Sequence, residues 1–408
     1  MNKVVISGRG LITPLGNGLA INELALRNGT SGITKSIDWE ERGLKSLVGG
    51  FCDSNSPCSL YGPKEKRFMP DNAKTALAAV EEAMTEAQLT KEELQRYRVG
   101  VIGGTAGSNY EEVYQYSKAF ADSGNVRKVT PCAVPRVMPS SAVANISLLL
   151  GITGENYDIS SACASSAYAL IVAARLIHFG VYDIIIAGGS DQLNWVQALG
   201  FNSIRALSTK YNETPMIASR PFDRDRDGFV IAEGAGYMIL ESEEHAKKRK
   251  VSPKGIISGW AANSNATDMV QPNVDASASA MLEAVKNAGL TPQDINYVNA
   301  HGTATPIGDP IEMRAIKATF GKHPAINSTK SMTGHMIGAT GAVEIIFTTM
   351  MMEKNFICPS INLDNPEDEF AGSDLVTELR EGVNIKHAIS NSFAFGGSNA
   401  CLVVSQPQ

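Results

Sequence analysis

The sequence lacks any apolar run near the ~20 residues that a membrane-spanning helix needs, and it lacks the apolar core of a signal peptide. Its six cysteines have no metal-type spacing, because Cys52 and Cys58 are too far apart for a Cys-x-x-Cys site. Linkers rich in proline, serine or charge are missing as well. We therefore expect a cytoplasmic protein with no membrane contact, whose parts pack closely.

The sequence also lacks the patterns of common ligand sites. A net charge of −6 provides no basic field for nucleic acid. Gly8 and Gly10 have no third glycine of a dinucleotide fingerprint, because Thr13 stands there. The stretch from Asp223 resembles a calcium loop, but its twelfth position is Gly234 and not glutamate. We expect no metal and no cofactor.

What is present is an alternation of strand-like and helical segments over 408 residues that are 43% hydrophobic. This alternation predicts an α/β protein with buried parallel strands. The strand-like runs are 3–7, 98–102, 183–187, 296–300 and 326–329, and the alanine-rich helical runs are 72–88 and 276–289. Sliding the chain by about 201 positions lays Ala79–Thr90 over Ala280–Thr291, which is the pattern of a duplicated unit or a chance match of two alanine-rich helices.

The segment Tyr157–Ala167 is the strongest candidate for chemistry. A short strand turns there into the helical run 164–179, which puts Cys163 at a helix N-terminus. The helix dipole and free N–H groups favour the thiolate form, which is the nucleophile. A cysteine among alanines is about as often a core residue, so partners are needed to decide.

Two histidines offer such partners. His301 lies in Asn299-Ala-His-Gly-Thr-Ala-Thr305 after one predicted strand, and His335 ends Lys330-Ser-Met-Thr-Gly-His335 after the next. A thiol with imidazoles is the minimal set for acyl transfer through a thioester. Near the C-terminus, Gly396-Gly397 can present backbone N–H groups to an oxyanion or simply form a hairpin turn.

These motifs together resemble those of the β-ketoacyl-acyl-carrier-protein synthases I and II of the thiolase superfamily. The resemblance covers nearly the whole chain and includes the Cys163 segment, Gly188-Gly189, Ala206-Leu-Ser208, 219–230, 233–236, the two histidine motifs and Phe395-Gly-Gly397. It implies a thiolase-like duplicated fold, a five-layered α-β-α-β-α sandwich, with one half over residues 1–250 and the other over 251–408.

The resemblance also implies a role for each matching position. Cys163 carries the acyl group, its own N–H and that of Phe395 form the oxyanion hole, and His301 and His335 hold the malonyl thioester. Lys330 is expected to pair with Glu312. The remaining implied positions are Thr303, Thr305, Phe393 and Gly107 for substrate and pantetheine, Asp309, Glu312 and Glu344 for structural support, and Ala394, Phe395, Gly396 and Gly397 for gating.

The implied reaction is decarboxylative condensation of malonyl carrier in fatty-acid synthesis. The alternative is a ketosynthase of a specialised type II polyketide or aryl polyene pathway, paired with a chain-length-factor subunit. The implied partner is an acyl carrier protein, docked on the basic side chains Lys64, Lys66, Arg67, Arg127 and Lys128, and the implied assembly is a homodimer or that heterodimer.

Two departures from the family pattern concern substrate shape. Ala394 replaces the usual first glycine of Gly-Phe-Gly-Gly, which predicts a stiffer gate if residue 394 must adopt positive φ and no change if it does not. Gly107 stands where many synthase II enzymes have a bulky aliphatic residue, so the chain is closer to synthase I.

Overall fold

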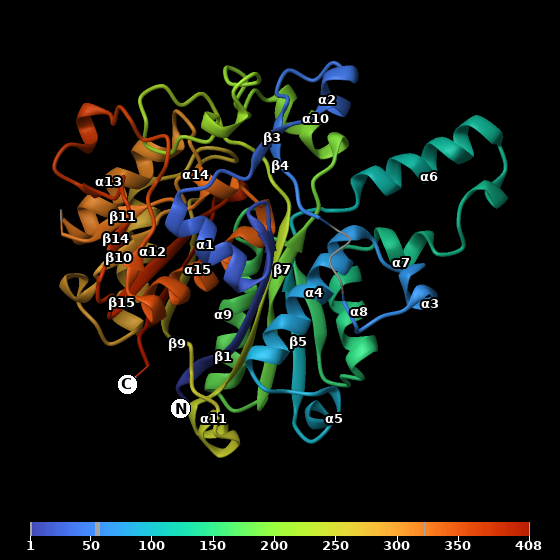
Figure 1. Cartoon of the computed structure of the whole chain (residues 1–408), viewed down its shortest axis with the longest axis horizontal. Helices are drawn as coiled ribbons and strands as arrows, with labels where there is room; N and C mark the ends of the chain where they lie inside the picture. Colours follow the sequence, from blue (N-terminus) through green and yellow to red (C-terminus); the bar gives the residue numbers. More distant parts are fainter. Residues whose placement is uncertain (1, 54–57, 322, 408) are drawn as a thin grey trace.

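A computed structural model describes residues 2–53, 58–321 and 323–407 (Figure 1). Its main sheet contains two sets of strands that have the same order and the same directions. The first set runs β6 (Asn156–Ile159), β5 (Val99–Gly104), β7 (Ile184–Asp191), β8 (Gly234–Ser242) and β1 (Val4–Thr13). The second runs β11 (Ala325–Asn327), β10 (Tyr297–Asn299), β15 (His387–Phe393), β16 (Ser398–Ser405) and β9 (Gly255–Ser264), with β13 (Asp374–Leu375) outside β11.

In each set the first three strands are parallel and the last two pair antiparallel. The sets join where β1 pairs antiparallel with β9, from Val4 opposite Ile257 to Ile6 opposite Gly255. The predicted duplication is therefore confirmed. The predicted boundary at residues 250 and 251 falls between α11 (Glu243–Arg249) and β9, and it stays a prediction.

Helices form three layers around these strands. The helices α9 (Ser165–His178) and α15 (Thr340–Lys354) contact each other and strands of both sets, so they form the central layer. The helices α4 (Asp71–Glu86) and α8 (Ser141–Leu150) cover the outer face of the first set, and α12 (Val274–Asn287) covers that of the second beside α13 (Gly308–Phe320). This is the predicted five-layered sandwich.

The internal repeat has a packing reason. Ala83 of α4 and Ala284 of α12, which are 201 positions apart, each lie against a glycine of the neighbouring strand. A Cβ on Gly8 would lie 2.1 Å from the Ala83 carbonyl oxygen, and one on Gly259 would lie 2.3 Å from that of Ala284. Helix and strand backbones approach so closely that neither glycine position accepts a side chain.

A second similarity follows each of these helices. Thr90 and Glu93 form a capping box after α4, and Thr291 and Asp294 form another after α12. The shared pattern of the two halves therefore extends beyond the helices themselves.

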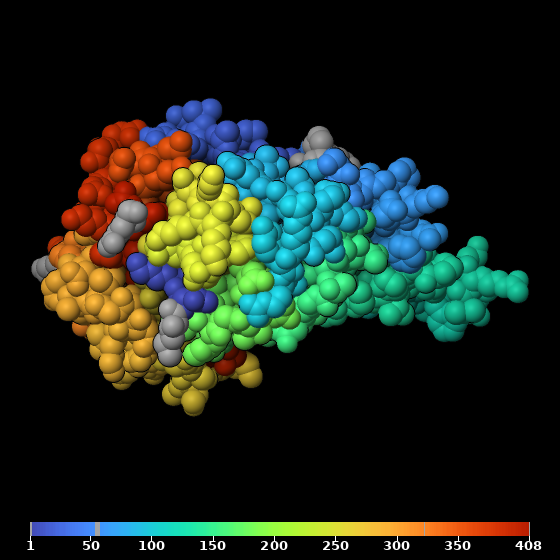
Figure 2. Space-filling view, turned by 90° about the horizontal axis from the view of Figure 1, so that it is seen from below, coloured from blue at the N-terminus to red at the C-terminus, as the bar shows by residue number. Residues whose placement is uncertain are grey.

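An arm extends from the first half. It consists of α6 (Tyr110–Ser123), the short helix η1 (Val126–Lys128) and α7 (Ala133–Val137). The α6 part projects away from the body in both views (Figures 1 and 2), while α7 returns to lie beside α8. None of its helical residues is buried, and its exposed apolar side chains include Val113, Phe120, Val126 and Val134.

The remaining helices are shorter or peripheral. They are α1 (Leu19–Asn28), α2 (Ile37–Glu41), α3 (Pro63–Lys66), α5 (Lys91–Leu94), α10 (Trp195–Ser203) and α14 (Lys330–Thr333). Across the described ranges, no helix is both long and apolar enough to cross a membrane.

Candidate active site

Cys163 lies on a strained turn between β6 and α9. Ala162, just before it, has φ +46°, a conformation that costs a residue with a Cβ about 1–2 kcal/mol. The Ser165 hydroxyl holds the turn, since it accepts a hydrogen bond from the Ser161 N–H (2.8 Å) and donates one to the Ala162 carbonyl (2.7 Å). Strain of this kind collects at functional sites, where surrounding bonds sustain it.

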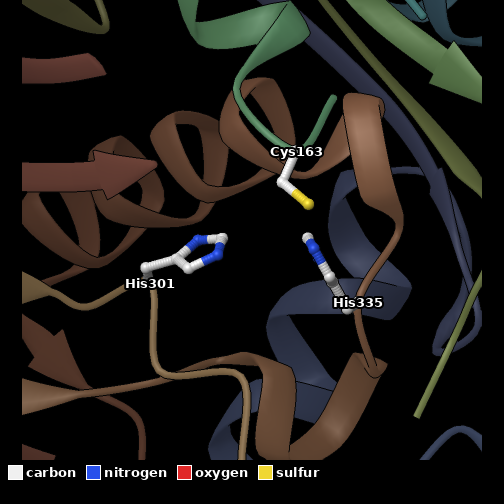
Figure 3. Close-up of side chains that lie close together, drawn as sticks. All are labelled: Cys163, His301 and His335. Atoms are coloured by element: carbon white, nitrogen blue, oxygen red, sulfur yellow. The ribbon is translucent and has the colours of Figure 1, made fainter. Parts of the chain in front are cut away.

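Two neighbouring parallel strands bring the histidines to the same turn. His301 follows β10, and His335 follows β11 and the short helix α14. The carboxyl ends of β10 and β11 lie at the same edge of the sheet. One ligand atom from each of Cys163, His301 and His335 lies within 4.8 Å of the others, and Figure 3 shows both rings turned toward the sulfur.

Both imidazoles are neutral at pH 7. Burial lowers the pKa of each histidine well below its usual value, and the nearby Lys330 charge lowers it further. His335 Nδ1 lies 3.1 Å from Thr340 Oγ1, while its Nε2 and the Nδ1 of His301 are buried without a hydrogen-bond partner among the described residues. If Thr340 donates to Nδ1, the Nε2 of His335 carries a proton and faces the site as a donor.

The resting state of Cys163 differs from the sequence-based expectation. Burial raises the pKa of the Cys163 thiol to about 12, although the Lys330 charge and the N–H groups of Phe395 and of Cys163 itself lower it. Desolvation outweighs the helix dipole here, which is worth at most about 2 kcal/mol. The thiol is therefore protonated at rest, and its proton must leave as the sulfur attacks.

The predicted pairing of Lys330 with Glu312 is wrong. Lys330 Nζ lies 2.6 Å from Oε1 of Glu344, and both side chains are 1% exposed. Glu312 instead accepts hydrogen bonds from the N–H groups of His301 (2.7 Å) and Gly302 (2.6 Å) and from Asn391 (3.1 Å). Glu312 therefore holds the His301 loop, while Glu344, from α15, neutralises the buried ammonium.

We expect Glu344→Ala to lower the stability of the protein by about 3–5 kcal/mol, because it leaves the Lys330 ammonium buried and unpaired. A clear shift of the urea midpoint toward lower urea measures this. Glu243→Ala is the matched control, since its ion pair with Lys247 lies at the surface and is worth less than about 1 kcal/mol. Equal midpoints for the two variants would contradict the role of the buried pair.

In the predicted gating segment, position 394 has a backbone conformation that does not require glycine. Ala394 has φ −115°, which any residue adopts, whereas Gly396 and Gly397 have φ +81° and +76°. The alanine is thus unstrained in this conformation, which agrees with the second of the two expectations for residue 394. The loop is held in this conformation by hydrogen bonds from the Gly396 N–H to the Met269 carbonyl and from the Asn265 N–H to the Gly397 carbonyl. Gating itself stays a prediction.

A cavity of about 470 Å³ leads to the site. Its lining contains these predicted residues: Cys163, His301, His335, Thr303, Thr305, Asp309, Glu312, Phe393, Ala394 and Phe395. Asp309 supports the wall by accepting hydrogen bonds from the N–H groups of Phe222 (2.8 Å) and Thr305 (3.3 Å). Gly107 is absent from this lining, and a Cβ there would lie 2.1 Å from the Tyr110 hydroxyl.

Sequence reasoning missed several residues of the lining, among them Phe201, Ile204 and Arg205. Phe201 has its ring 6.3 Å from that of Phe395, and Ile204 and Arg205 follow it in the lining. Both Ile204 and Arg205 are exposed, and Arg205 has φ +56°. The only available signal was their position directly before the Ala206-Leu-Ser208 motif.

The predicted docking residues form two exposed groups. Lys64, Lys66 and Arg67 belong to α3 and the residue after it, whereas Arg127 and Lys128 belong to η1 on the arm. Arg136 of α7 links the arm to the first group, because it donates a hydrogen bond to the Met69 carbonyl (2.8 Å). Both groups are accessible to a partner.

Comparisons with known proteins agree with this arrangement. Residues 1–246 match the family "Beta-ketoacyl synthase, N-terminal domain" and residues 254–364 match "Beta-ketoacyl synthase, C-terminal domain". The chain is 41% identical to 3-oxoacyl-[acyl-carrier-protein] synthase 1 of Haemophilus influenzae over 405 residues, which covers 99% of this chain and 98% of that protein.

Solved structures give the same result. A β-ketoacyl synthase from Burkholderia phymatum has a TM-score of 0.95 at 34% identity, with full coverage of both chains. A ketosynthase of a type II polyketide system, solved in complex with its acyl carrier protein, has a TM-score of 0.91 at 31% identity, again with full coverage of both chains. The chain therefore belongs to the β-ketoacyl synthase family of condensing acyltransferases, as the sequence predicts.

Proposed function

We propose that this protein elongates acyl chains by decarboxylative condensation of a malonyl thioester with an acyl group held on Cys163. The observation that supports this most directly is the placement of one thiol and two neutral imidazoles at the end of a single cavity. The first half of this reaction needs a nucleophile that attacks the acyl thioester. The second half needs two hydrogen-bond donors to the enolate oxygen.

In the first half, the Cys163 sulfur attacks the acyl thioester and its proton passes to the departing pantetheine thiolate. A neighbouring neutral imidazole can relay that proton. The N–H groups of Phe395 and Cys163 lie close enough to the sulfur to lower its pKa, so they lie within reach of the carbonyl oxygen that becomes negative. Acyl-Cys163 and the free carrier thiol are the products.

In the second half, a malonyl thioester places its carbonyl oxygen between His301 and His335. The carbon–carbon bond to the carboxylate breaks and carbon dioxide leaves. The electron pair of that bond stays behind and forms an enolate, whose oxygen accepts hydrogen bonds from the imidazoles. The enolate carbon then attacks the acyl carbonyl, the carbon–sulfur bond to Cys163 breaks, and a proton taken up from solvent restores the thiol. No cofactor takes part in these steps.

Elongation in fatty-acid synthesis is preferred to a specialised pathway because the relative named a 3-oxoacyl-[acyl-carrier-protein] synthase 1 is more similar than the polyketide ketosynthase. Native mass spectrometry after co-expression with the neighbouring genes tests this choice. A homodimer supports it, and a stable heterodimer with a second ketosynthase-like chain contradicts it.

The homodimer has support in the exposed surface. β6 ends the order of the sheet, so its outer edge has no strand partner among the described residues, and α6 and α7 have exposed apolar side chains. Such an edge is normally covered. Sedimentation analysis at micromolar concentration is expected to find two chains, and a monomer would contradict this.

The proposed second partner is an acyl carrier protein, a small acidic helical protein. The polyketide ketosynthase with a TM-score of 0.91 was solved with such a partner. Three basic groups of this chain offer complementary charge: the α3 group, the η1 group and Arg205 at the mouth of the cavity.

We expect reversal of charge at Arg67 together with Arg127 to raise KM for the carrier-bound substrate about ten-fold. That factor corresponds to about 1.4 kcal/mol, or about 0.7 kcal/mol for each exposed charge. Steady-state kinetics with a carrier substrate and with a small pantetheine thioester measures it, and the small substrate should be unaffected. Lys247→Glu on α11 is the control, and equal losses with both substrates would show damage to the fold instead of docking.

A further inference from the structure

We propose that Cys163, His301 and His335 form a binding site for a divalent transition-metal ion of the zinc class, which blocks the condensing site reversibly. One thiolate and two imidazoles form a ligand set that zinc accepts, and three protein ligands leave a fourth position for water. The role is that of an inhibitor and not of a cofactor.

The geometry is close to that of a metal site without being preformed. A tetrahedral zinc ion requires about 3.6 Å between sulfur and nitrogen and about 3.3 Å between the two nitrogens. The three ligand atoms already lie within 4.8 Å of one another, so each pair must approach by at most about 1.5 Å. Figure 3 shows the two rings turned toward the sulfur, and their planes are nearly perpendicular, at 88°.

The ring nitrogens are available to a metal. His335 Nε2 and His301 Nδ1 are buried without a hydrogen-bond partner in the part of the chain that the structure describes. Thr340 lies 3.1 Å from the other nitrogen of His335, where it can accept the Nδ1–H of a metal-bound ring. An oriented histidine with such an outer partner is the usual arrangement at zinc ligands.

The charges around the ligands are mixed, and the cavity gives a metal ion access. Lys330 lies close enough to lower the pKa of both histidines, but its ammonium is paired with Glu344, and Glu312 is buried nearby as well. The cavity of about 470 Å³ reaches all three ligands and supplies both an entry path and the fourth ligand. On binding, a metal–sulfur bond forms, the thiol proton leaves to solvent, and nothing is oxidised.

A bound metal ion would block both the acylation of Cys163 and the decarboxylation of the malonyl thioester. The sulfur electron pair would be held by the metal, and neither imidazole could then donate to an enolate oxygen. Acylation of Cys163 removes the thiolate and should protect the site. The proposal is independent of substrate choice, because it rests on the three ligands alone.

Cobalt(II) binding is the direct test, since a tetrahedral cobalt–thiolate site has a near-ultraviolet charge-transfer band and strong visible bands. Titration of the full chain with cobalt(II) should give both at one equivalent, and zinc(II) should remove them. The charge-transfer band should disappear in Cys163→Ser and persist in Cys132→Ser, whose cysteine lies beside the arm helix α7.

Affinity measurements extend the test. His335→Ala should raise the zinc Kd by more than about 100-fold, and Thr340→Val by about ten-fold, while Thr340→Ser should bind like the wild type. Zinc should inhibit condensation until a chelator is added, and acylated enzyme should be protected. An unchanged spectrum in Cys163→Ser, or no cobalt–thiolate band in the wild type, overturns the proposal even if condensation itself is confirmed.

Discussion

Cys163→Gln is expected to abolish condensation, by at least about 10⁴-fold, while carbon dioxide is still released from the malonyl substrate. The loss follows because, among the described residues, Cys163 is the one cysteine that lines the cavity, and a glutamine amide cannot form the acyl intermediate. Decarboxylation needs only donors to the enolate oxygen, and His301 and His335 remain. The glutamine amide also fits the space of an acyl thioester, and its oxygen can accept hydrogen bonds from the backbone N–H groups of residues 163 and 395.

Intact-mass measurement with an acyl donor and assay of carbon dioxide release check both parts of this result. The wild type should acquire one acyl adduct and Cys163→Gln none. Cys132→Gln, on a half-buried cysteine outside the cavity, is the control and should behave like the wild type. Labelling at Cys132 or at the buried Cys401 would overturn the assignment of the nucleophile.

His335→Ala is expected to reduce both condensation and decarboxylation by about 100- to 1000-fold, the usual effect of losing one donor to a developing oxyanion. His335 is 2% exposed, so bulk water replaces a missing hydrogen bond poorly there. kcat should therefore fall far more than KM rises.

His335→Asn should restore part of the activity, because an amide N–H can replace one imidazole donor. His323→Ala is the structural control, since that ring bonds the Phe320 and Ile295 carbonyls and lies outside the cavity lining. Carbon dioxide release at the wild-type rate in His335→Ala would refute the assigned role.

Much of the fold could be predicted because its signals are local. Short apolar runs predicted the strands β5, β7 and β10. Alanine-rich runs predicted the helices α4 and α12. The turn at Cys163 was predictable because a short strand ran directly into a helical pattern. Motifs within a few residues of one another also placed His301 and His335 after adjacent strands.

The partner of Lys330 was decided by helix placement. Glu312 and Glu344 lie on α13 and α15, and nothing in their local sequence says which helix passes over α14. Packing of α15 in the central layer brings Glu344 to 2.6 Å from the ammonium, while α13 turns Glu312 toward the His301 loop.

The residues by themselves determined which groups this protein uses: one thiol on a strand-to-helix turn, two histidines after neighbouring strands and a lysine close by. Only the tertiary structure decided the state of those groups. Burial in the central layer keeps the Cys163 thiol protonated and both imidazoles neutral, against the helix dipole that the local sequence suggested. Desolvation depends on every atom packed around a group, so no segment of sequence can report it.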